Sequence, residues 1–303
     1  MEKMQNAALY ESENGKIYCQ DFVNAIRKTG IRKGDAVFAH SSVSAFGKLC
    51  TSDRNFLLQS LTDSLKECVG DEGMIIMPTF TYSFDKNQTY DADNTKSTVG
   101  ILTEFFRKQK DVKRTLHPNH SVAVWGKHKE DLLNIGKDTF DDDSIFGKLH
   151  KLNGKIVFLG APFQSCTFAH YIEQKHNVPY RRMSRFRGKI ISHGKAYDDE
   201  ITFYNRYSFF FNSFARFEHH LLDKGLMKTV KVGDGNILMV ESSTMFKEGC
   251  KLLDDDKYYF LKNEPFIFKI FNIFIYPFLK YAPWLIKILD KIAYKIIYRK
   301  AKA

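Results

Sequence analysis

Four short apolar runs, each leading into a loop of small or polar residues, constrain the fold of this 303-residue chain most strongly. Each run has the length of a buried strand. Apolar residues make up 44% of the sequence and charged residues 27%, which is typical of an ordered globular protein rather than a disordered one. The runs therefore predict buried strands in a folded domain. They span residues 36–39, 74–77, 121–125 and 154–160.

Segments between and after these runs carry hairpin or helical patterns. Glycine turns at Gly194 and at Gly233 each separate two extended runs, and each predicts a β-hairpin. The aromatic segment 209–222 predicts a buried helix. An N-cap at Ser97 or Thr98 predicts the start of another helix. The remaining predicted helices span residues 21–29, 55–68, 167–176 and 242–252.

Cysteine usage and the N-terminal residues indicate the compartment. Five cysteines are scattered without a C-x-x-C pair, so the sequence predicts neither a disulfide framework nor a zinc site. Residues 1–10 lack the basic and apolar segments of a secretory signal. Both features favour the reducing cytoplasm. The acidic run 138–143 suits a solvated loop or a helix cap better than a metal site, because successive side chains cannot all face one ion.

Positive charge is concentrated at the C-terminal end of the sequence. Residues 266–303 contain eight Lys or Arg side chains against Asp290 alone, and they carry +7 of the net charge of +11. The nearly balanced remainder offers no basic surface to a nucleic acid, so we expect no nucleic-acid partner. We therefore divide the chain into a globular domain at residues 1–264 and a basic tail at residues 265–303.

The tail has the pattern of amphipathic helices. Lys287, Lys291 and Lys295 recur every four residues on one stripe, while apolar side chains fill the opposite side. Pro277 and Pro283 interrupt the apolar run, which leaves it too short to span a bilayer. The pattern predicts peripheral contact with the anionic inner face of a membrane. Packing against the domain, or against a second copy in a homodimer, is the alternative.

Two histidines, His117 and His120, lie directly before the predicted strand 121–125. Pro118 fixes its own backbone and pushes the preceding histidine into an extended conformation. The two imidazoles are thereby held on a stiff strand entrance. A polar loop with two solvated histidines is the alternative interpretation.

Two further segments carry residues suited to a ligand or to catalysis. The predicted strand 36–39 leads into a serine-rich loop, residues 40–47, whose backbone N–H groups suit an anionic ligand. An ordinary connecting loop is the alternative. On the predicted helix 167–176, His170 and Glu173 are three residues apart and share one face. That pair is either functional or a surface contact.

Four segments, in their order along the chain, resemble the aminoglycoside 3-N-acetyltransferase family: residues 40–42, 73–80, 114–126 and 149–180. The third reads R-T-L-H-P-N-H-S-V-A-V-W-G, close to the family pattern R-S-x-H-P-x-H-S-V-A-A-x-G. The fourth holds a T-x-x-H-x-x-E helix followed by Val-Pro-Tyr. The resemblance extends over about residues 21–245.

The resemblance implies an α/β sandwich with a central mixed sheet flanked by helices, unrelated to the GNAT fold. It implies acetyl-CoA as the co-substrate and no metal. Catalysis would fall to His170, Glu173 and His120. Contacts with CoA would fall on Ser41, Ser42, Val43, Ser44, Arg114, Thr115 and Ser121, and contacts with the acceptor on Phe80, Tyr82, His117, Tyr180, Arg181 and Tyr204.

The acidic partner of His170 is left open by the sequence. Several family members carry an orienting carboxylate on the strand after the hairpin, where residues 202–207 of this chain hold none. The candidates are Glu173, Asp143, and Asp199 or Glu200 just before that strand.

The chemistry implied by the resemblance requires a base. An amine must lose a proton before it attacks a thioester, and a histidine of near-neutral pKa suits that task. A positioned base contributes about 10²–10⁴-fold in rate. A neighbouring carboxylate fixes the tautomer of the histidine. Backbone N–H groups of the serine loop or the hydroxyl of Ser121 would bind the oxyanion.

Arginines near the expected acceptor side suggest which amine is acetylated. Aminoglycosides are polycations, whereas this chain holds four arginines within residues 181–187. Arginine suits phosphate, so we expect a nucleotide-linked amino sugar used in lipopolysaccharide O-antigen or capsule synthesis. An aminoglycoside-resistance enzyme is the alternative. A non-catalytic relative that binds CoA or a protein partner is the third hypothesis.

Overall fold

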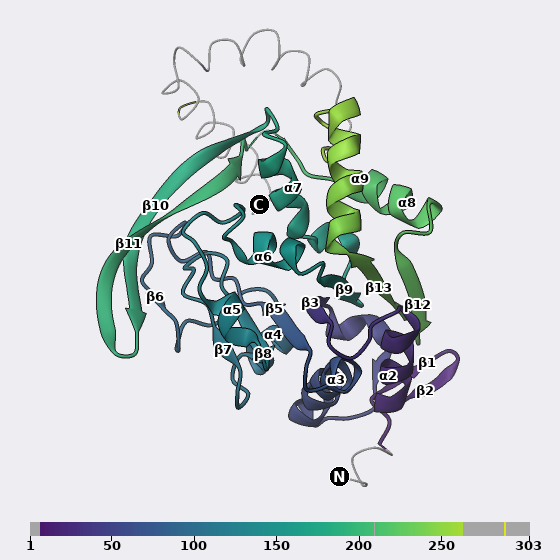
Figure 1. The fold of residues 1–303 in the computed structure, drawn as a ribbon. Helices are drawn as coiled ribbons and strands as arrows, with labels where there is room; N and C mark the ends of the chain where they lie inside the picture. Colours follow the sequence, from purple (N-terminus) through teal and green to yellow (C-terminus); the bar gives the residue numbers. More distant parts are fainter. Residues whose placement is uncertain (1–6, 209, 263–287, 289–303) are drawn as a thin grey trace.

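The central element is a seven-stranded mixed sheet (Figure 1). The computed structural model describes residues 7–208, 210–262 and 288. Strand β3 (Ala36–Ser41) runs parallel to its two neighbours, and the other neighbouring pairs are antiparallel. The predicted mixed sheet is confirmed. Its order is β12 (Lys228–Val232), β13 (Gly235–Glu241), β9 (Lys155–Leu159), β3, β5 (Met74–Pro78), β8 (Val122–Gly126) and β7 (Lys113–Arg114).

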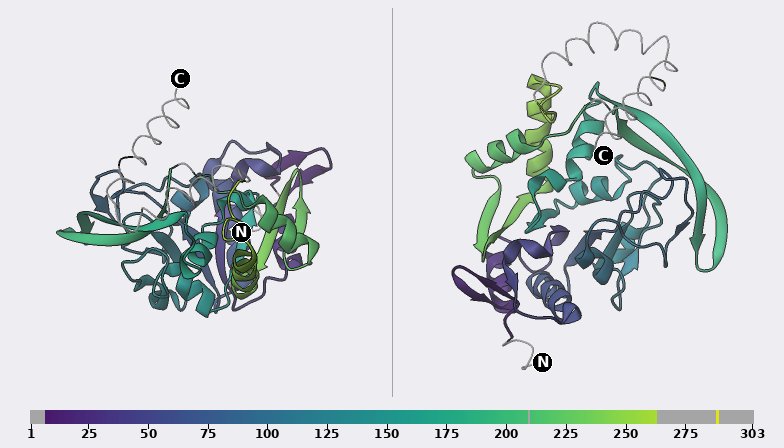
Figure 2. Two further views of the ribbon diagram at one scale, coloured as in Figure 1. Left: turned by 90° about the horizontal axis from the view of Figure 1, so that it is seen from above. Right: turned by 180° about the vertical axis from the view of Figure 1, so that it is seen from behind.

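Helices cover both faces of this sheet, so the predicted α/β sandwich is confirmed (Figure 2). Successive side chains of a strand point to opposite faces, and Val37 and Phe38 accordingly belong to different cores. On the Val37 face lie α2 (Cys19–Lys28), α3 (Arg54–Val69) and α4 (Ile101–Phe106). On the Phe38 face lie α5 (Lys129–Leu133), α6 (Ile145–Lys151), α7 (Phe168–Lys175), α8 (Ala215–Asp223) and α9 (Ser242–Asp255).

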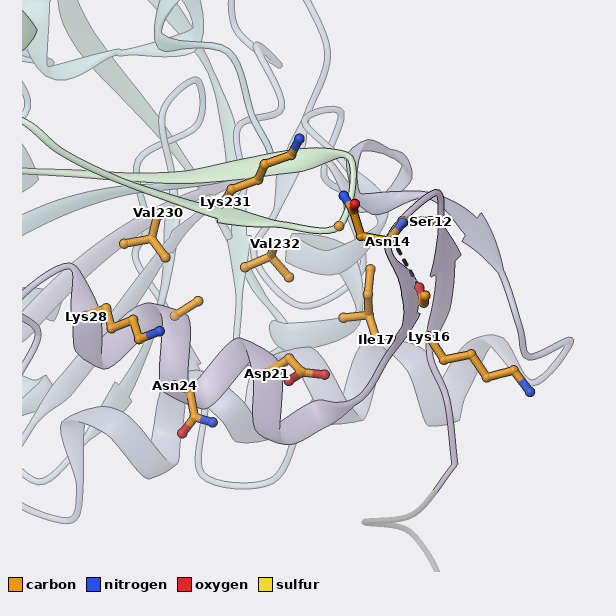
Figure 3. A pocket seen from close by; sticks show the side chains of 13 residues that line it. Ser12, Asn14, Lys16, Ile17, Asp21, Asn24, Lys28, Val230, Lys231 and Val232 are labelled. Carbon is orange, nitrogen blue, oxygen red and sulfur yellow. Dashed lines mark hydrogen bonds between the residues drawn. The ribbon is translucent and has the colours of Figure 1, made fainter.

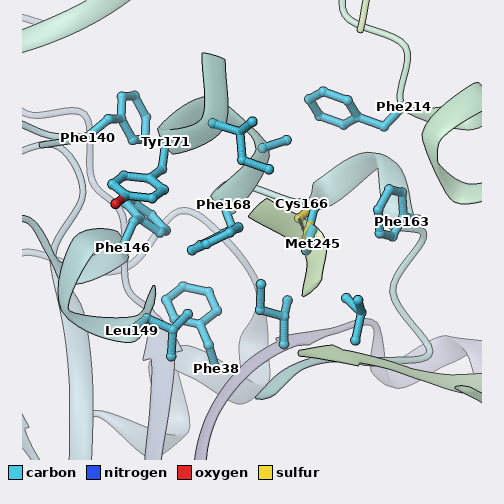
Figure 4. Packing of buried hydrophobic residues seen from close by; sticks show 14 of the residues in the cluster. Phe38, Phe140, Phe146, Leu149, Phe163, Cys166, Phe168, Tyr171, Phe214 and Met245 are labelled. Atoms are coloured by element: carbon cyan, nitrogen blue, oxygen red, sulfur yellow. Dashed lines mark hydrogen bonds between the residues drawn. The ribbon is translucent and has the colours of Figure 1, made fainter. Parts of the chain in front are cut away.

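The core on the α7 side is built largely from aromatic rings (Figure 4). Phe140 and Phe146 are fully buried there, with ring centroids 5.4 Å apart. Cys166 lies in the same core, and burial raises the pKa of its thiol to about 12. A thiol in that state is protonated and a poor nucleophile.

A long hairpin extends from the domain along one side (Figure 1). It consists of β10 (Arg181–Ser192) and β11 (Lys195–Arg206), and its turn has positive φ at His193 and Gly194. The hairpin predicted at Gly194 is confirmed, and it is longer than the apolar runs indicate. Strand β6 (Tyr90–Asp91) pairs with β10 in parallel.

Several elements, among them β7, α5 and α6, have no counterpart in the sequence patterns. Strands β1 (Tyr10–Ser12), β2 (Gly15–Ile17) and β4 (Lys48–Leu49) form a separate three-stranded sheet. Two 3₁₀ helices, η1 (Val43–Phe46) and η2 (Phe163–Ser165), follow β3 and β9.

Two predicted helices differ from the structure. The helix predicted over 209–222 begins only at Ala215. Phe210 and Phe214 are each buried in the core, and Asn212 pairs with Leu261 in an isolated β-bridge, which keeps the segment before Ala215 out of the helix. The helix predicted from Ser97 or Thr98 begins at Ile101. The backbone N–H of Ser97 instead binds the carboxylate of Glu104. The predicted helices near α2, α3, α7 and α9 and the hairpin at Gly233 are confirmed.

The tail at residues 265–303 lies outside the described residues, apart from Ile288. Its amphipathic helices, its membrane contact and its role in a homodimer therefore stay predictions, as does the boundary at residue 264. Among the residues that the structure does describe, we find no helix with the length and apolarity needed to cross a bilayer.

Candidate active site

The carboxyl ends of β3, β5 and β9 meet at one edge of the sheet, because the three strands are parallel. The loops after β3 and β9 are joined by a hydrogen bond from Ser42 N to Leu159 O, 2.9 Å long. The loop after β5 is joined to the start of β8 by a bond from Thr79 N to Ser121 O. The predicted site residues that follow these strands are thus brought to one edge.

His170 and Glu173 form a hydrogen-bonded pair on α7. The i, i+3 spacing places Nδ1 of His170 2.6 Å from Oε2 of Glu173. The carboxylate is fully buried, whereas the imidazole side chain keeps 22% of its surface exposed. An ionised carboxylate only accepts hydrogen bonds, so in the tautomer that donates to Glu173 the proton is on Nδ1 and Nε2 is the basic nitrogen. No side chain in the described part of the chain bonds Nε2 of His170.

Glu173 is held in its ionised form by four neighbours. Oε1 accepts hydrogen bonds from the hydroxyl of Tyr180, at 2.7 Å, and from Nδ2 of Asn212, at 2.9 Å. Nε of Arg181 lies 2.8 Å from Oε2 as an ion pair rather than an aligned hydrogen bond. Burial by itself raises the pKa of Glu173, but Arg181, His170 and Tyr180 lower it to about 2.

The imidazole of His170 is neutral at pH 7. Burial lowers its pKa below the usual 6.5, and Arg181 lowers it further, while Glu173 acts in the opposite direction. A neutral imidazole with a bonded Nδ1 and an open Nε2 is the state that a general base requires.

His120 lies in an aromatic cage one ring away from His170. Its ring stacks on Phe203 with centroids 5.2 Å apart, and Phe80 and Tyr82 pack around it. Phe140 contacts both histidines, at 5.6 Å from His120 and 5.7 Å from His170. Burial holds the pKa of His120 well below 6.5. Nδ1 of His120 is buried without a hydrogen-bond partner among the described residues. The structure thus brings His120 near His170 and Glu173 without a hydrogen bond to either.

His117 is bonded within the protein at both ring nitrogens. Nδ1 accepts the backbone N–H of His120 at 3.0 Å, so Nε2 carries the proton and donates to the hydroxyl of Thr139 at 3.2 Å. That hydroxyl in turn donates to Thr202 O on β11. Burial lowers the pKa of His117 to about 4. The predicted contact of His117 with the acceptor stays a prediction, and its side chain already joins the turn to the hairpin.

The serine loop has two features that fit CoA. Ser41 Oγ is buried without a partner among the described residues. Gly160 faces the loop at φ +70°, and a Cβ there would lie 2.7 Å from Ser42 O. The unpaired hydroxyl is available to a phosphate or an amide of a ligand, and the missing Cβ lets the loops after β3 and β9 pack closely enough to shape this region. Val43 lies in η1, where its carbonyl accepts the hydroxyl of Tyr10, and Ser44 is exposed.

Arg114, Thr115 and Ser121 join β7 and β8 to the neighbouring loops. The hydroxyl of Ser121 donates to Thr79 O at 2.7 Å, and Nε of Arg114 donates to Ser121 Oγ at 3.1 Å. Thr115 Oγ1 accepts the backbone N–H of Val122. The proton of the Ser121 hydroxyl is therefore committed inside the protein and is not free for an oxyanion. The contacts of these residues with CoA stay predictions.

The aromatic residues predicted to contact the acceptor also pack within the fold. Tyr180 is fully buried on Glu173, and the hydroxyl of Tyr204 donates to Val178 O at 2.7 Å. Phe80 is buried, and Tyr82 is half-buried with a positive φ of 55°. Their contact with a substrate stays a prediction.

In the structure, the acidic residue that contacts His170 is Glu173. Asp143 is exposed and lies 4.0 Å from Lys151. Asp199 forms an ion pair with Lys137, and Glu200 with Arg187. Of these candidates, Glu173 is the one in contact with His170.

Three residues of this region are not identified as site residues by the sequence patterns. Asn212 appears as a lone amide in an aromatic segment, and Phe140 as one ring in an acidic run. His40 belongs to the family-like segment, but nothing in its pattern assigns it a role. Its ring stacks on Phe158 at 5.2 Å, its Nε2 is buried without a partner, and burial lowers its pKa to about 3.

Two cavities lie away from His170. One of about 300 Å³ separates the β1–β2 hairpin from α2 and β12, and Lys28 and Lys231 line it (Figure 3). Another of about 590 Å³ is lined by Arg107, Lys113 and Arg114, but the guanidinium of Arg114 is already bonded to Thr79, Ala92 and Thr95. Within the described ranges, no cluster of three or more His, Cys, Asp or Glu side chains is arranged to hold a metal.

Known proteins similar to this chain are described as aminoglycoside acetyltransferases or as proteins like them. The family profile described as Aminoglycoside 3-N-acetyltransferase matches residues 38–254. The SPbeta prophage-derived aminoglycoside N(3')-acetyltransferase-like protein YokD of Bacillus subtilis (strain 168) is 30% identical over 200 residues, which cover 58% of this chain and 71% of that protein. Aminoglycoside N(3)-acetyltransferase III of Pseudomonas aeruginosa is 26% identical over 196 residues, which cover 57% of this chain and 69% of that protein.

The fold is shared with solved structures as well. The structure described as AAC-IIIb in a binary complex with CoASH superposes with a TM-score of 0.68 at 19% identity. The superposition covers 82% of this chain and 98% of that chain. At this level of identity the likeness concerns the fold alone.

Proposed function

The chain belongs to the aminoglycoside 3-N-acetyltransferase family, and from this we propose that it transfers an acetyl group from acetyl-CoA to an amine of an aminoglycoside-like amino sugar. The single observation that carries the proposal is the pair on α7. A neutral, partly exposed His170 is bonded through Nδ1 to the buried carboxylate of Glu173, and the ring of Phe140 contacts both His170 and His120 of the family-like H-P-x-H segment.

In the proposed reaction, His170 is the base. Nε2 accepts the proton that the ammonium group of the acceptor must lose before it attacks the acyl carbon. Glu173 holds the Nδ1 proton and stabilises the imidazolium that forms, without itself taking a proton. The aromatic rings of Phe140 and Phe214, 5.7 Å from the imidazole, exclude water from its sides.

Acetyl-CoA supplies the acyl group as a thioester. Residues of the serine loop would hold it, with Ser41 Oγ and the backbone beside Gly160 as the nearest fitting features. Backbone N–H groups of this loop would also bind the developing oxyanion, since the hydroxyl of Ser121 is already used by Thr79.

A nucleotide-linked amino sugar is the competing acceptor, and the observation that favours it is Arg206. Arg206 ends β11, where its guanidinium lies over the ring of Phe211, and its charge is one of the smaller causes that lower the pKa of His170. A cation near the base would attract a phosphate. The arginines of β10 give less support than the sequence indicates. Arg181 is buried on Glu173, Arg187 pairs with Glu200, and Arg182 lies over the ring of Tyr207. Family membership therefore makes the aminoglycoside-like acceptor the better supported of the two.

The test is acetyl-CoA turnover, followed by thiol release, with two panels of acceptors. Kanamycin-type aminoglycosides form one panel, and dTDP- and UDP-amino sugars form the other. Acetylation of the aminoglycosides is the expected result. Turnover of the nucleotide sugars alone would replace the proposed acceptor with its competitor and place the chain in lipopolysaccharide or capsule synthesis. CoA binding without turnover of any acceptor would instead identify a non-catalytic relative.

A further inference from the structure

Glu173 creates an electrostatic problem for a base. A buried carboxylate 2.6 Å from an imidazole stabilises the imidazolium strongly and raises the pKa of the histidine. An imidazole that is already protonated at neutral pH cannot accept a proton from a substrate. The pair on α7 therefore needs a nearby positive charge if His170 is to stay neutral.

Arg181, the first residue of β10, supplies that charge from within the core. Its side chain is 3% exposed, and its Nε lies 2.8 Å from Oε2 of Glu173. Its Nη2 lies 2.8 Å from Nδ1 of His170. A guanidinium cannot accept a hydrogen bond, so this contact opposes positive charge on the imidazole while the carboxylate favours it. The two neighbours act in opposite directions on one nitrogen.

The guanidinium is fixed by contacts that leave it no alternative position. Nη1 donates to Tyr204 O at 2.9 Å, and Nη2 donates to Asn212 Oδ1 at 3.0 Å. Asn212 also donates to Glu173, so one amide holds both members of the ion pair. These contacts therefore hold the guanidinium of Arg181 against the carboxylate of Glu173 and leave it unavailable to a ligand.

We propose that Arg181 is a positioning residue: its guanidinium cancels the charge of Glu173 beside His170, so that the imidazole stays neutral and able to take a proton. The catalytic consequence rests on the proposed function, whereas the effect on His170 does not. The other groups that face His170 act weakly or in the same direction. Arg206 on β11 adds positive charge, and His120 is neutral at pH 7.

The test is the titration of His170 in the full chain, followed by NMR of its ring protons and assigned by the signal lost in His170→Gln. Arg181→Gln should raise the titration midpoint by about one unit or more, and Glu173→Gln should lower it by a similar amount. The double variant should return close to the wild-type midpoint. Arg187→Gln, which removes an exposed arginine paired with Glu200, is the matched control and should leave the midpoint unchanged.

The double variant keeps the test decisive if a single variant does not fold, because it leaves no unpaired buried charge. An Arg181 that only packs would leave the double variant with the lowered midpoint that loss of Glu173 produces. That result, or an unchanged midpoint in Arg181→Gln, overturns the inference.

Activity provides a separate readout. The acidic limb of kcat/KM should follow the same order as the NMR midpoints once an acceptor is known. If the midpoints shift as expected and no acceptor is acetylated, the proposed function fails and the role of Arg181 stands.

Discussion

Nδ1 of His170 lies 2.6 Å from Oε2 of Glu173, three residues further along the same helix, and the carboxylate has no exposed surface. In the tautomer that donates this proton to the carboxylate, Nε2 is the basic nitrogen, and no protein group among the described residues bonds it. A surface contact between two solvated side chains would show neither the full burial nor the two additional hydrogen-bond donors and the buried arginine beside the carboxylate.

Replacing His170 by Asn should lower kcat for acetyl transfer by about 10²–10⁴-fold, because the base is removed while hydrogen bonding to Glu173 is retained. The measurement is thiol release from acetyl-CoA with the best acceptor. His219→Asn, on the exposed face of α8, is the control and should keep wild-type activity. Equal activity of the two variants would rule out His170 as the base.

Tyr180→Phe should destabilise the protein by about 1.5–3 kcal/mol, since the carboxylate of Glu173 loses a buried hydrogen-bond donor. Activity should fall by much less than in His170→Asn, because Asn212 and Arg181 still bind Glu173. Urea unfolding gives the stability change. Tyr197→Phe, on the exposed part of β11, should leave the free energy of unfolding unchanged. A neutral result for Tyr180→Phe would show that its hydroxyl contributes nothing to the network.

Thr139→Val should cost about 1–3 kcal/mol, because Nε2–H of His117 is left buried without an acceptor. Thr139→Ser keeps the hydroxyl and should stay within about 1 kcal/mol of wild type. Equilibrium unfolding of the two variants makes the comparison. If Thr139→Val proves no more damaging than Thr139→Ser, the hydrogen bond from His117 contributes nothing to stability.

Gly160→Ala should weaken CoA binding by about tenfold or more, because the added Cβ displaces the backbone of the serine loop at Ser42. Gly194→Ala is a matched control: its φ of +73° is similar, but a Cβ there meets nothing within 4 Å. Calorimetric titration with CoA distinguishes the two. A loss of affinity in both variants would indicate general strain rather than a defect in the loop.

Stability should fall as the pH drops below 6.5. His40 and His117 have pKa values lowered to about 3 and about 4 in the folded protein, so the unfolded chain binds their protons at higher pH. Their contribution is complete above pH 6.5 and is lost as the pH falls toward the folded values, at up to about 1.4 kcal/mol per pH unit for each histidine. His40→Phe should reduce this slope by about one proton. An unchanged slope of unfolding free energy against pH would mean that His40 is not buried neutral.

The sheet could be predicted because its strands are short apolar runs with clear ends, and the hairpins because glycine marks their turns. The pair on α7 could be predicted from i, i+3 spacing, which fixes contact within a helix. These are local relationships, and each is complete within a few residues of sequence.

The surroundings of Glu173 could not be predicted, because they depend on contacts between distant segments. Arg181 looks like a phosphate ligand in sequence, and its burial against a carboxylate appears only when β10 is placed beside α7. Asn212 lies in an aromatic segment whose composition favours a helix, yet its backbone pairs with Leu261 in an isolated β-bridge and its side chain binds Glu173. The tail of the chain and the identity of the acceptor remain predictions.

The partners of Glu173 also determine when the site can exist. During synthesis, α7 leaves the ribosome before Tyr180, which follows Glu173 by seven positions, and before Asn212, which follows it by thirty-nine. A carboxylate without these partners costs several kcal/mol to bury, so docking of α7 on the sheet is opposed until the later segments have been made. A nascent chain that ends before Asn212 lacks one of the donors that keep Glu173 ionised, so its buried carboxyl would hold a proton more readily. The charged state of the pair on α7 is therefore complete only after Asn212 has been made.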